Sequence, residues 1–343
     1  MRELEINGKT GRSKICVGEK ISNLSKYLAD SPAIVITDEN VARHYQQYFP
    51  DCERIVLETG EAIKTLDTVR ELYERLIALA ADRSVCLIGI GGGIVCDITG
   101  FTASTYLRGV RFGYVPTTLL AQVDASVGGK TGVNFSGYKN MIGVFSQPDF
   151  VICDPEILMT LPEAELAAGF AEIIKHAAIA DAGYFSFLEK NTGNGLEMSL
   201  DILEKIIYDS VAIKAAIVGR DETEKGERRK LNFGHTFGHA VEKTTGLPHG
   251  MAVSIGMMTA AKLSSAKGML DAADVDRIEN LLARFSLPTR LDFDADRLMD
   301  AMARDKKREG DHIHFVLLSA IGKSVIAPIT LTELAAVLGS NLD

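Results

Sequence analysis

The run VCLIGIGGG, residues 85–93, is the stretch that decides the fold. Its first six residues form a short apolar run of the kind found in strands buried on both faces of a sheet. Three glycines follow, and a helix-like run then continues as far as Tyr106. A strand, a glycine turn and a helix in this order predict one repeat of an alternating α/β fold.

The same alternation extends to both sides of this run. Further strand-like runs cover residues 13–17, 33–37, 54–57, 112–115 and 150–153. Helical periodicity covers residues 66–81, and Thr117 with Thr118 opens another helical stretch. Strands that alternate with helices predict an α/β domain with a parallel sheet covered on both faces.

Helical patterns dominate the chain after Pro155, so the domain boundary is predicted between residues 154 and 155. Helices are expected over residues 163–180, 200–218, 251–267, 275–285 and 331–338. Residues 301–310 are expected to carry a helix end into a loop, and residues 313–318 form a short strand-like run. The prediction is an α/β domain over residues 1–154 and a mainly α-helical domain over residues 155–343.

Composition narrows the class of protein. The formal net charge is −9, so non-specific nucleic-acid binding is not expected, and an anionic ligand needs a local cluster of cations. The N-terminus lacks the apolar core of a signal peptide, and no run is long enough to span a bilayer. The five cysteines are scattered and odd in number, which predicts reduced thiols and a cytoplasmic protein.

Two short loops have the composition of phosphate sites. In residues 91–93, glycines let backbone N–H groups approach an anion at the start of a helix. The strict dinucleotide fingerprint is absent, because Ile94 occupies its third glycine position. In the second loop, Thr117 and Thr118 either bind an anion or simply cap a helix. Asp38 follows an early strand, where an acid either binds an adenosine ribose or caps the next helix.

Residues 124–140, DASVGGKTGVNFSGYKN, form a third candidate. They contain four glycines and the lysines Lys130 and Lys139 in a run that reads as a loop. Such a loop is either a flexible surface or a folded anion site. The apolar lead-in to Lys130 favours the anion site.

The three histidines of residues 230–250 predict a metal site. His235 and His239 are four residues apart in a helical pattern, and His249 follows a Gly-Leu-Pro break where the chain can fold back. Imidazole is the commonest ligand of zinc-like metals, although one or two of these histidines could instead be capped or buried in a core. Glu172 shares a helical face with Lys175 and His176. It is either buried beside a cation such as a metal, or part of a solvated pair with Lys175.

Several sequence blocks, taken in order, carry a family resemblance. They are GGGIVCDITGFTASTYLRGVRF, VPTTLLAQVDASVGGKTGVN, KNMIG, GFAEIIKHA, LNFGHTFGHAVE and LPHG. With these blocks the chain resembles the 3-dehydroquinate synthase family over nearly its whole length. The first blocks are also similar to the wider superfamily of glycerol dehydrogenases and iron-type alcohol dehydrogenases. The resemblance implies an NAD-binding Rossmann-like domain over residues 1–154 and an α-helical metal- and substrate-binding domain over residues 155–343.

The resemblance also implies roles for individual residues. The metal, usually zinc and also cobalt, is bound by Glu172, His235 and His249, while His239 becomes a residue of the catalytic pocket. The residues implied for NAD+ are Asp38, Thr59, Gly60, Glu61, Ala62, Ile63, Lys64, Gly92, Gly93, Ile94, Val95, Cys96, Asp97, Thr117, Thr118, Leu120, Asp124, Lys130, Lys139, Ile157, Leu158, Met159, Thr160 and Leu161. Those implied for the substrate are Arg108, Asp124, Lys130, Lys139, Asn140, Lys175, Lys214, Arg228, Asn232, His239 and Lys306. The implied catalytic set is Lys130, Lys175, Arg228, Asn232 and His239.

The implied activity is a phosphate-eliminating lyase of the shikimate pathway to chorismate and the aromatic amino acids. Its small-molecule substrate is 3-deoxy-D-arabino-heptulosonate 7-phosphate, and NAD+ is recycled within the reaction. Arg108 matches an arginine that the family contributes across a homodimer interface. The alternatives are another sugar phosphate cyclase, of the valiolone or deoxyinosose type, and a metal-dependent polyol dehydrogenase. A non-catalytic regulatory relative is disfavoured by the intact set of Glu172, His235 and His249.

Overall fold

The computed structural model describes residues 1–28, 31–193, 198–290, 308–309, 312–330 and 332–334. The chain forms two compact units. The first comprises Met1–Pro162 and Leu203–Thr223, and the second comprises Glu163–Ile202 and Glu224–Asp343. The division predicted between residues 154 and 155 separates an NAD-binding domain from a metal- and substrate-binding domain. It stays a prediction, because the two compact units are defined by packing and not by what they bind. Lys306 and most of the stretches predicted over residues 301–310 and 331–338 lie outside the described residues.

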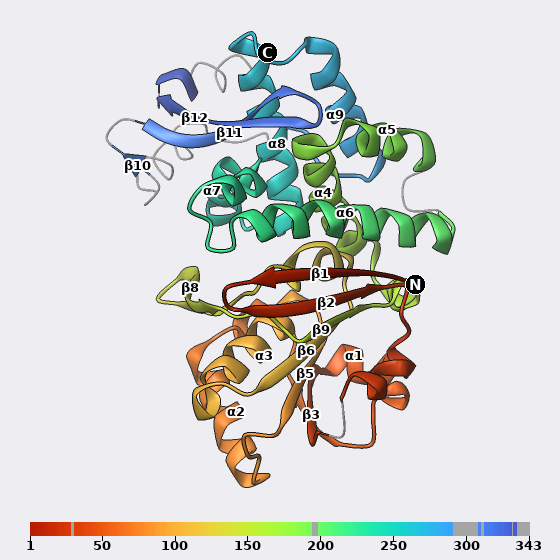
Figure 1. Ribbon diagram of the computed structural model, residues 1–343. Helices are drawn as coiled ribbons and strands as arrows, with labels where there is room; N and C mark the ends of the chain where they lie inside the picture. The colour runs from red at the N-terminus through yellow and green to blue at the C-terminus, as the bar shows by residue number, and fades with distance from the viewer. Residues whose placement is uncertain (29–30, 194–197, 291–307, 310–311, 331, 335–343) are drawn as a thin grey trace. The chain divides into compact units, whose positions relative to one another are not determined.

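The first unit is built on a seven-stranded sheet (Figure 1). Its strands are β1 (Arg2–Gly8), β2 (Gly11–Val17), β3 (Ala33–Asp38), β4 (Glu53–Leu57), β5 (Cys86–Gly91), β6 (Arg111–Pro116) and β9 (Phe150–Cys153). Their order is β1-β2-β9-β6-β5-β3-β4, and every neighbouring pair is parallel except β1 with β2. The predicted parallel sheet is confirmed, and the antiparallel edge strand β1 adds to it.

The first unit also contains helices of various lengths. They are α1 (Glu39–Tyr45), α2 (Leu66–Ala78), α3 (Gly93–Thr105) and most of α6 (Leu200–Arg220), with the shorter helices η1 (Ile21–Tyr27), η2 (Gln46–Tyr48), η3 (Glu61–Ile63), η4 (Tyr106–Arg108), η5 (Ala121–Ala125) and η6 (Pro155–Thr160). The residue Glu222 follows α6 and accepts hydrogen bonds from Lys9 N at 2.7 Å and Gln147 Nε2 at 3.0 Å. It therefore links the segment around α6 to the β1–β2 turn.

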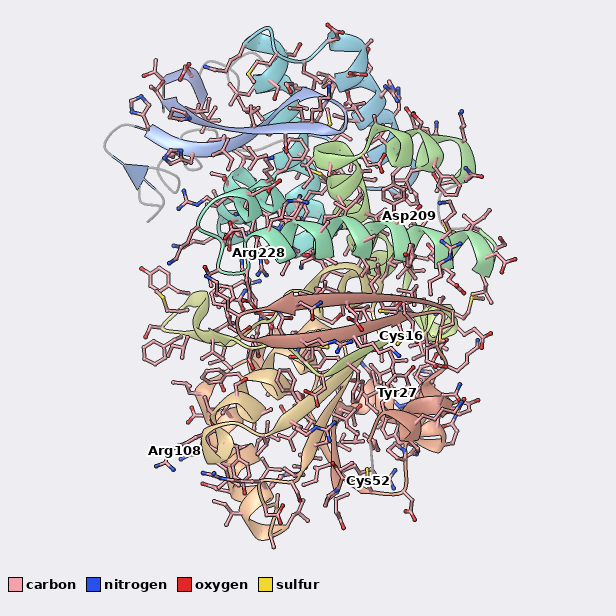
Figure 2. All side chains as sticks on the ribbon, viewed as in Figure 1. Cys16, Tyr27, Cys52, Arg108, Asp209 and Arg228 are labelled. Carbon is pink, nitrogen blue, oxygen red and sulfur yellow. The ribbon has the colours of Figure 1, made fainter. Side chains whose placement is uncertain are left out.

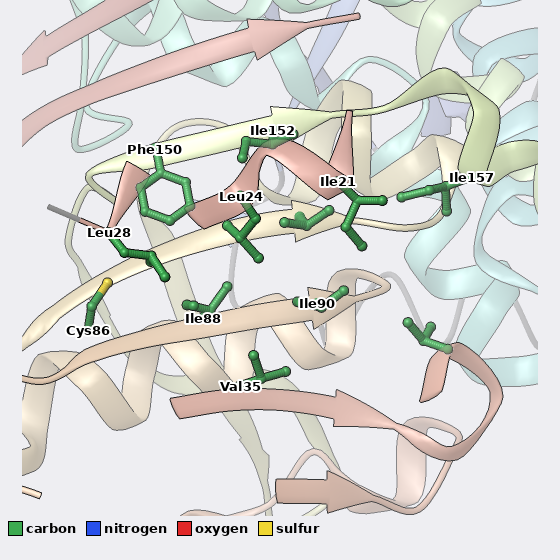
Figure 3. Close-up of a cluster of buried hydrophobic side chains, with 12 residues drawn as sticks. Ile21, Leu24, Leu28, Val35, Cys86, Ile88, Ile90, Phe150, Ile152 and Ile157 are labelled. Atoms are coloured by element: carbon green, nitrogen blue, oxygen red, sulfur yellow. The ribbon is translucent and has the colours of Figure 1, made fainter. Parts of the chain in front are cut away.

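Apolar side chains pack on both faces of this sheet. Val35, Ile88 and Ile90 point to one face, where Ile21 and Leu24 of η1 cover them (Figure 3). The intervening residue Gly89 points to the other face, where a Cβ atom would lie 3.0 Å from the Thr99 side chain of α3. The alternation of side chains along β5 thus places one helix on each side.

The predicted loop over residues 124–140 is wrong for most of its length. Residues from Lys130 onward form an antiparallel hairpin of β7 (Lys130–Phe135) and β8 (Tyr138–Phe145). Ser136 and Gly137 join the strands with φ values of 49° and 78°. Two positive φ values suit a tight hairpin turn whose twist matches the strands. Backbone pairing therefore orders a stretch whose glycine content suggested a loop.

The second unit combines helices with a small sheet. Its helices are α4 (Glu163–Ala180), α5 (Ala182–Asn191), α7 (His235–Thr245), α8 (His249–Ala266) and α9 (Ala272–Arg284), preceded at α7 by η7 (Glu227–Asn232). Its antiparallel sheet has the order β10 (Arg308–Glu309), β11 (His312–Ala320) and β12 (Lys323–Thr330). The helices predicted over residues 163–180, 251–267 and 275–285 are confirmed, and β12 adds a strand that was not expected. None of the helices within the described ranges is long and apolar enough to cross a membrane.

All five cysteines carry free thiols, as predicted. Cys16, Cys86, Cys96 and Cys153 are buried, and Cys52 is partly exposed. Figure 2 labels Cys16 and Cys52.

Candidate metal centre and nucleotide-binding loops

Three helices of the second unit each supply one residue of the predicted metal triad. Glu172 lies on α4, His235 is the first residue of α7, and His249 is the first residue of α8. Gly246 ends α7 in the left-handed conformation with φ 73°, and Pro248 precedes α8. This short turn folds the chain back, so that His249 returns to the side of α7 that carries His235.

The three side chains converge on one carboxylate oxygen. His235 Nε2 lies 3.5 Å from Glu172 Oε1, and His249 Nε2 lies 3.6 Å from the same atom. Glu172 is fully buried, and its other oxygen contacts the ammonium group of Lys175. The alternative prediction, a solvated pair of Glu172 with Lys175, is therefore wrong, because the Lys175 side chain is only 1% exposed.

The electrostatics of this cluster are dominated by burial and by mutual charge. Burial alone would raise the pKa of Glu172, but Lys175 and the two histidines hold that pKa well below its usual range. Burial lowers the pKa of His235 well below its usual range, against the pull of the Glu172 carboxylate. Burial also opposes a charge on His249, but the carboxylates of Glu172 and Glu242 outweigh it and raise its pKa to about 9.

The donor set fits a divalent metal ion. Glu172 Oε1 is buried and accepts no hydrogen bond from the residues that the structure describes, although two imidazole nitrogens point at it. The ligand atoms of Glu172, His235 and His249 all lie within 4.8 Å of one another. One carboxylate oxygen and two imidazoles are a usual protein set for zinc, which leaves a position open for a further ligand. A metal would also satisfy the orphaned oxygen.

The remaining predicted residues of the second unit lie around α7. His239 is exposed, and its ring centroid lies 5.3 Å from that of His235. Arg228 is buried in η7 and is labelled in Figure 2. Asn232 Nδ2 donates to Glu224 Oε1 at 2.6 Å.

In the first unit the two predicted phosphate loops lie side by side. Thr117 N donates to Gly91 O at 2.9 Å. A Cβ atom on Gly92 would lie 3.2 Å from the Thr118 methyl group. Thr118 Oγ1 accepts from Ala121 N, so it caps the following helix. The loops together present backbone N–H groups at the start of α3 with no side chain on Gly92 or Gly93, which fits the phosphates of a dinucleotide.

A polar network joins four more of the predicted NAD+ and substrate residues. Lys64 Nζ contacts the Asp97 carboxylate on α3 and donates to Asn140 Oδ1 at 2.6 Å. Asn140 N donates to Asn134 Oδ1 at 2.9 Å, and Asn134 Nδ2 donates to Glu61 Oε1 at 2.7 Å. Burial raises the pKa of Asp97, against the pull of Lys64. The network fixes the η3 segment and α3 against the hairpin.

Other predicted residues of the first unit lie apart from this network. Asp38 Oδ1 accepts from Asn40 N and Val41 N, at 2.9 and 3.0 Å, so it caps α1. Asp124 O accepts from Lys214 Nζ at 2.6 Å. Thr160 Oγ1 lies 2.8 Å from the Tyr45 hydroxyl.

Three predicted cations of the first unit are exposed. They are Lys130, Lys139 and Arg108. Arg108 extends outward from η4 (Figure 2), where its φ value is 67°.

Three polar residues escaped the sequence analysis. Asn134 and Glu224 contact the predicted residues Asn140 and Asn232. Glu242 Oε2 lies 3.4 Å from His249 Nδ1. A signal for Glu242 was present, because it lies three residues after His239 and seven after His235 on one helical face. Glu224 sits in a run of charged residues that gives no such signal.

Comparison with known proteins gives consistent results across the chain. A family model described as 3-dehydroquinate synthase N-terminal matches residues 54–168, and one described as 3-dehydroquinate synthase C-terminal matches residues 169–308. A curated protein named 3-dehydroquinate synthase from Dehalococcoides mccartyi is 42% identical over 343 residues. The alignment covers 95% of this chain and 96% of the relative.

Two solved structures are similar at lower sequence identity. A 2-deoxy-scyllo-inosose synthase complexed with carbaglucose-6-phosphate, NAD+ and Co2+ has a TM-score of 0.90 at 28% identity, covering 99% of this chain and 100% of its own. A 2-epi-5-epi-valiolone synthase from Streptomyces hygroscopicus with NAD+ and Zn2+ bound has a TM-score of 0.85 at 27% identity, covering 100% of this chain and 98% of its own. The metal triad, the paired glycine and threonine loops and the match over both parts of the sequence place this chain in the 3-dehydroquinate synthase family.

Proposed function

We propose that the protein is a 3-dehydroquinate synthase, which converts 3-deoxy-D-arabino-heptulosonate 7-phosphate to 3-dehydroquinate and phosphate. This is the second step of the shikimate pathway towards chorismate and the aromatic amino acids. The observation that carries the proposal is the convergence of Glu172, His235 and His249 in a chain whose curated relatives of that name match over nearly its full length. The reaction class is a carbon–oxygen lyase that eliminates phosphate.

The proposed cofactors are NAD+ and a divalent metal ion, zinc or cobalt. NAD+ supplies a reversible hydride acceptor and the metal supplies a Lewis acid. Glu172, His235 and His249 would hold the metal, and the glycine loop at Gly92 and Gly93 would face the dinucleotide phosphates.

The proposed reaction conserves the oxidation state of the substrate overall. The hydroxyl at carbon 5 is oxidised to a ketone, which acidifies the neighbouring C–H bond. The carbon of this C–H bond loses its proton as the C–O bond to phosphate breaks. The hydride removed from carbon 5 in the oxidation then returns to the ketone. The pyranose opens, and an intramolecular aldol reaction closes the carbocycle. The lysine and arginine side chains proposed for the substrate supply positive charge for its phosphate and carboxylate.

Individual residues are proposed to act as the resemblance implies. Lys175, Arg228 and His239 would bind the substrate or relay its protons. A homodimer with Arg108 reaching the partner's site is part of the proposal, as is a cytoplasmic location, which agrees with five free thiols.

The test follows two products at once. Purified protein loaded with Zn2+ or Co2+ is given the heptulosonate phosphate and sub-stoichiometric NAD+, while phosphate release and NADH absorbance are recorded. We expect many phosphates per NAD+ and no lasting NADH. The variant Glu172→Gln should lose most of this activity, whereas Glu165→Gln, at an exposed position on the same helix, should keep it.

Other outcomes point to other functions. NADH formed in proportion to substrate without phosphate release would indicate a polyol dehydrogenase. Inactivity with the heptulosonate phosphate, together with turnover of sedoheptulose 7-phosphate or glucose 6-phosphate, would indicate a sister cyclase. The two similar solved structures are synthases of this wider group.

A further inference from the structure

Glu242 is a carboxylate in an unfavourable position. It lies in the last turns of α7, where the helix dipole disfavours negative charge, and its side chain is only 12% exposed. A carboxylate that has lost most of its water needs a compensating partner. One partner is the ring of His249, with Glu242 Oε2 at 3.4 Å from Nδ1.

The two ring nitrogens of His249 face different carboxylates. Nδ1 faces Glu242 of α7, and Nε2 faces the orphaned oxygen of Glu172 on α4 at 3.6 Å. An imidazole that binds a metal through one nitrogen keeps its proton on the other, so an acceptor at Nδ1 matches the form whose Nε2 lone pair is open to a metal. The contact with Glu242 is the one that this metal-binding form requires.

His235 shows the same arrangement with a weaker acceptor. Its Nδ1 lies 3.3 Å from Phe233 O, and its Nε2 also points at Glu172 Oε1. Histidines that bind metals commonly pair their other nitrogen with a carbonyl or carboxylate, which fixes the ring and raises its basicity. At Nδ1, His235 thus faces a neutral carbonyl, whereas His249 faces a charged carboxylate. The His249 ring is also the more exposed, at 33% against 12%, so it needs the stronger restraint.

We infer that Glu242 is a positioning residue of the metal centre, which holds the His249 ring with Nε2 directed at the metal. The inference rests on the proposed function, since it assumes that the Glu172, His235 and His249 set binds a divalent ion. The turn of α7 into α8 gives it a physical basis, because Glu242 and His249 lie on opposite sides of the Gly246 turn. The Glu242 contact therefore also ties the start of α8 to α7.

The test measures metal affinity on metal-free protein. Co2+ is titrated into protein stripped with a chelator, and the visible d–d spectrum gives both the Kd and the ligand geometry. We expect Glu242→Leu to raise the Kd by about 10- to 100-fold, the range for lost partners of metal-bound histidines. Glu242→Gln keeps an acceptor oxygen without the charge, so its Kd should rise less. Saturated variants should give the wild-type spectrum, because the ligands are unchanged.

Matched variants separate the possible failures. Glu165→Gln, an exposed acid on α4, should leave the Kd unchanged, and Glu172→Gln should weaken binding most. If Glu172→Gln weakens binding but both Glu242 variants stay within twofold of wild type, the positioning role is overturned and the metal site stands. If Glu172→Gln also has no effect, the metal site and the proposed function fail together.

Two further readouts keep the result decisive. If Glu242→Gln saturated with Co2+ gives an altered d–d spectrum, Glu242 itself binds the metal, and the positioning role is overturned. The ligand atoms of Glu242, His239 and His249 lie within 4.8 Å of one another, so the geometry allows Glu242 to act as a ligand. Melting curves of the metal-free variants show whether Glu242→Leu still folds. If it does not, Glu242→Gln carries the test, and an unchanged Kd in that variant overturns the role.

Discussion

Lys175 brings a full positive charge into the interior of the second unit. It is 1% exposed and contacts the fully buried carboxylate of Glu172. A buried ion pair adds little stability over an apolar pair, but removing one partner leaves the other charge uncompensated. In the metal-free protein, Lys175 therefore neutralises the residue that a metal would otherwise neutralise.

We predict that Lys175→Met destabilises the metal-free protein by about 3 kcal/mol, as expected when one partner of a buried ion pair is lost. Urea unfolding measures this loss. Saturating Zn2+ should restore more stability to the variant than it adds to wild type, because the ion then faces an unpaired carboxylate. Lys267→Met breaks the exposed pair with Glu333 and should cost less than about 1 kcal/mol. Equal losses in the two variants would contradict the prediction.

At the scale of elements, α7 and α8 approach each other through glycine. A Cβ atom on Gly256 would lie 1.9 Å from Gly234 O, and one on Gly238 would lie 2.9 Å from Ala252 O. Gly234 immediately precedes His235, so the spacing of the two helices sets the distance between the two histidines of the triad. Small residues at this contact are therefore a requirement of the candidate metal centre as well as of the core.

We predict that Gly256→Ala lowers the free energy of unfolding by about 3 kcal/mol, because the backbone of α7 has to move to admit the methyl group. Co2+ affinity should fall with it. Gly219→Ala is the control, since at that exposed position in α6 none of the described residues has an atom within 4 Å of the added carbon. It should be neutral or stabilising by up to about 1 kcal/mol. Wild-type Co2+ affinity in Gly256→Ala would show that the helix spacing does not govern the site.

The elements differ in how far sequence alone could predict them. Strands such as β5 and β9 were predicted because they are buried on both faces and read as unbroken apolar runs. The edge strand β1 was missed, although Leu4 and Ile6 alternate with polar residues in the pattern of a half-buried strand. The β7–β8 hairpin reads as a loop because its order comes from cross-strand pairing between glycine-rich segments.

Some residues of the candidate site could be predicted from the sequence, and others could not. The family resemblance implied Glu172, His235 and His249 as a set, where spacing alone left His239 equally eligible. Glu242 required the fold, because its contact with His249 exists only once the turn at Gly246 has reversed the chain. The caps formed by Asp38 and Thr118 show that a helix-capping role was correct for both residues, and their roles towards NAD+ stay predictions.

Across the whole molecule, the thiols are protected by burial. Burial raises the pKa of Cys86 to about 12 and holds that of Cys96 well above its usual value. A raised pKa means less reactive thiolate at pH 8, and enclosure blocks the reagent as well. We predict one readily labelled thiol in the native protein, the partly exposed Cys52, and five after unfolding in urea. Cys52→Ser should abolish the native reaction with a thiol-specific dye, and several fast-reacting thiols in the native protein would contradict this.

The order of segments along the chain has a consequence for biosynthesis. The first unit is interrupted by Glu163–Ile202 and regains its last piece only with Leu203–Thr223. That piece carries Lys214, which binds Asp124, and Glu222, which binds Lys9 beside the β1–β2 turn. On the ribosome, the first unit therefore cannot complete its contacts when its own sheet has emerged. It must wait until a helix pair of the other unit has been translated, so cutting the gene after residue 162 would yield an unfinished product and not an independent domain.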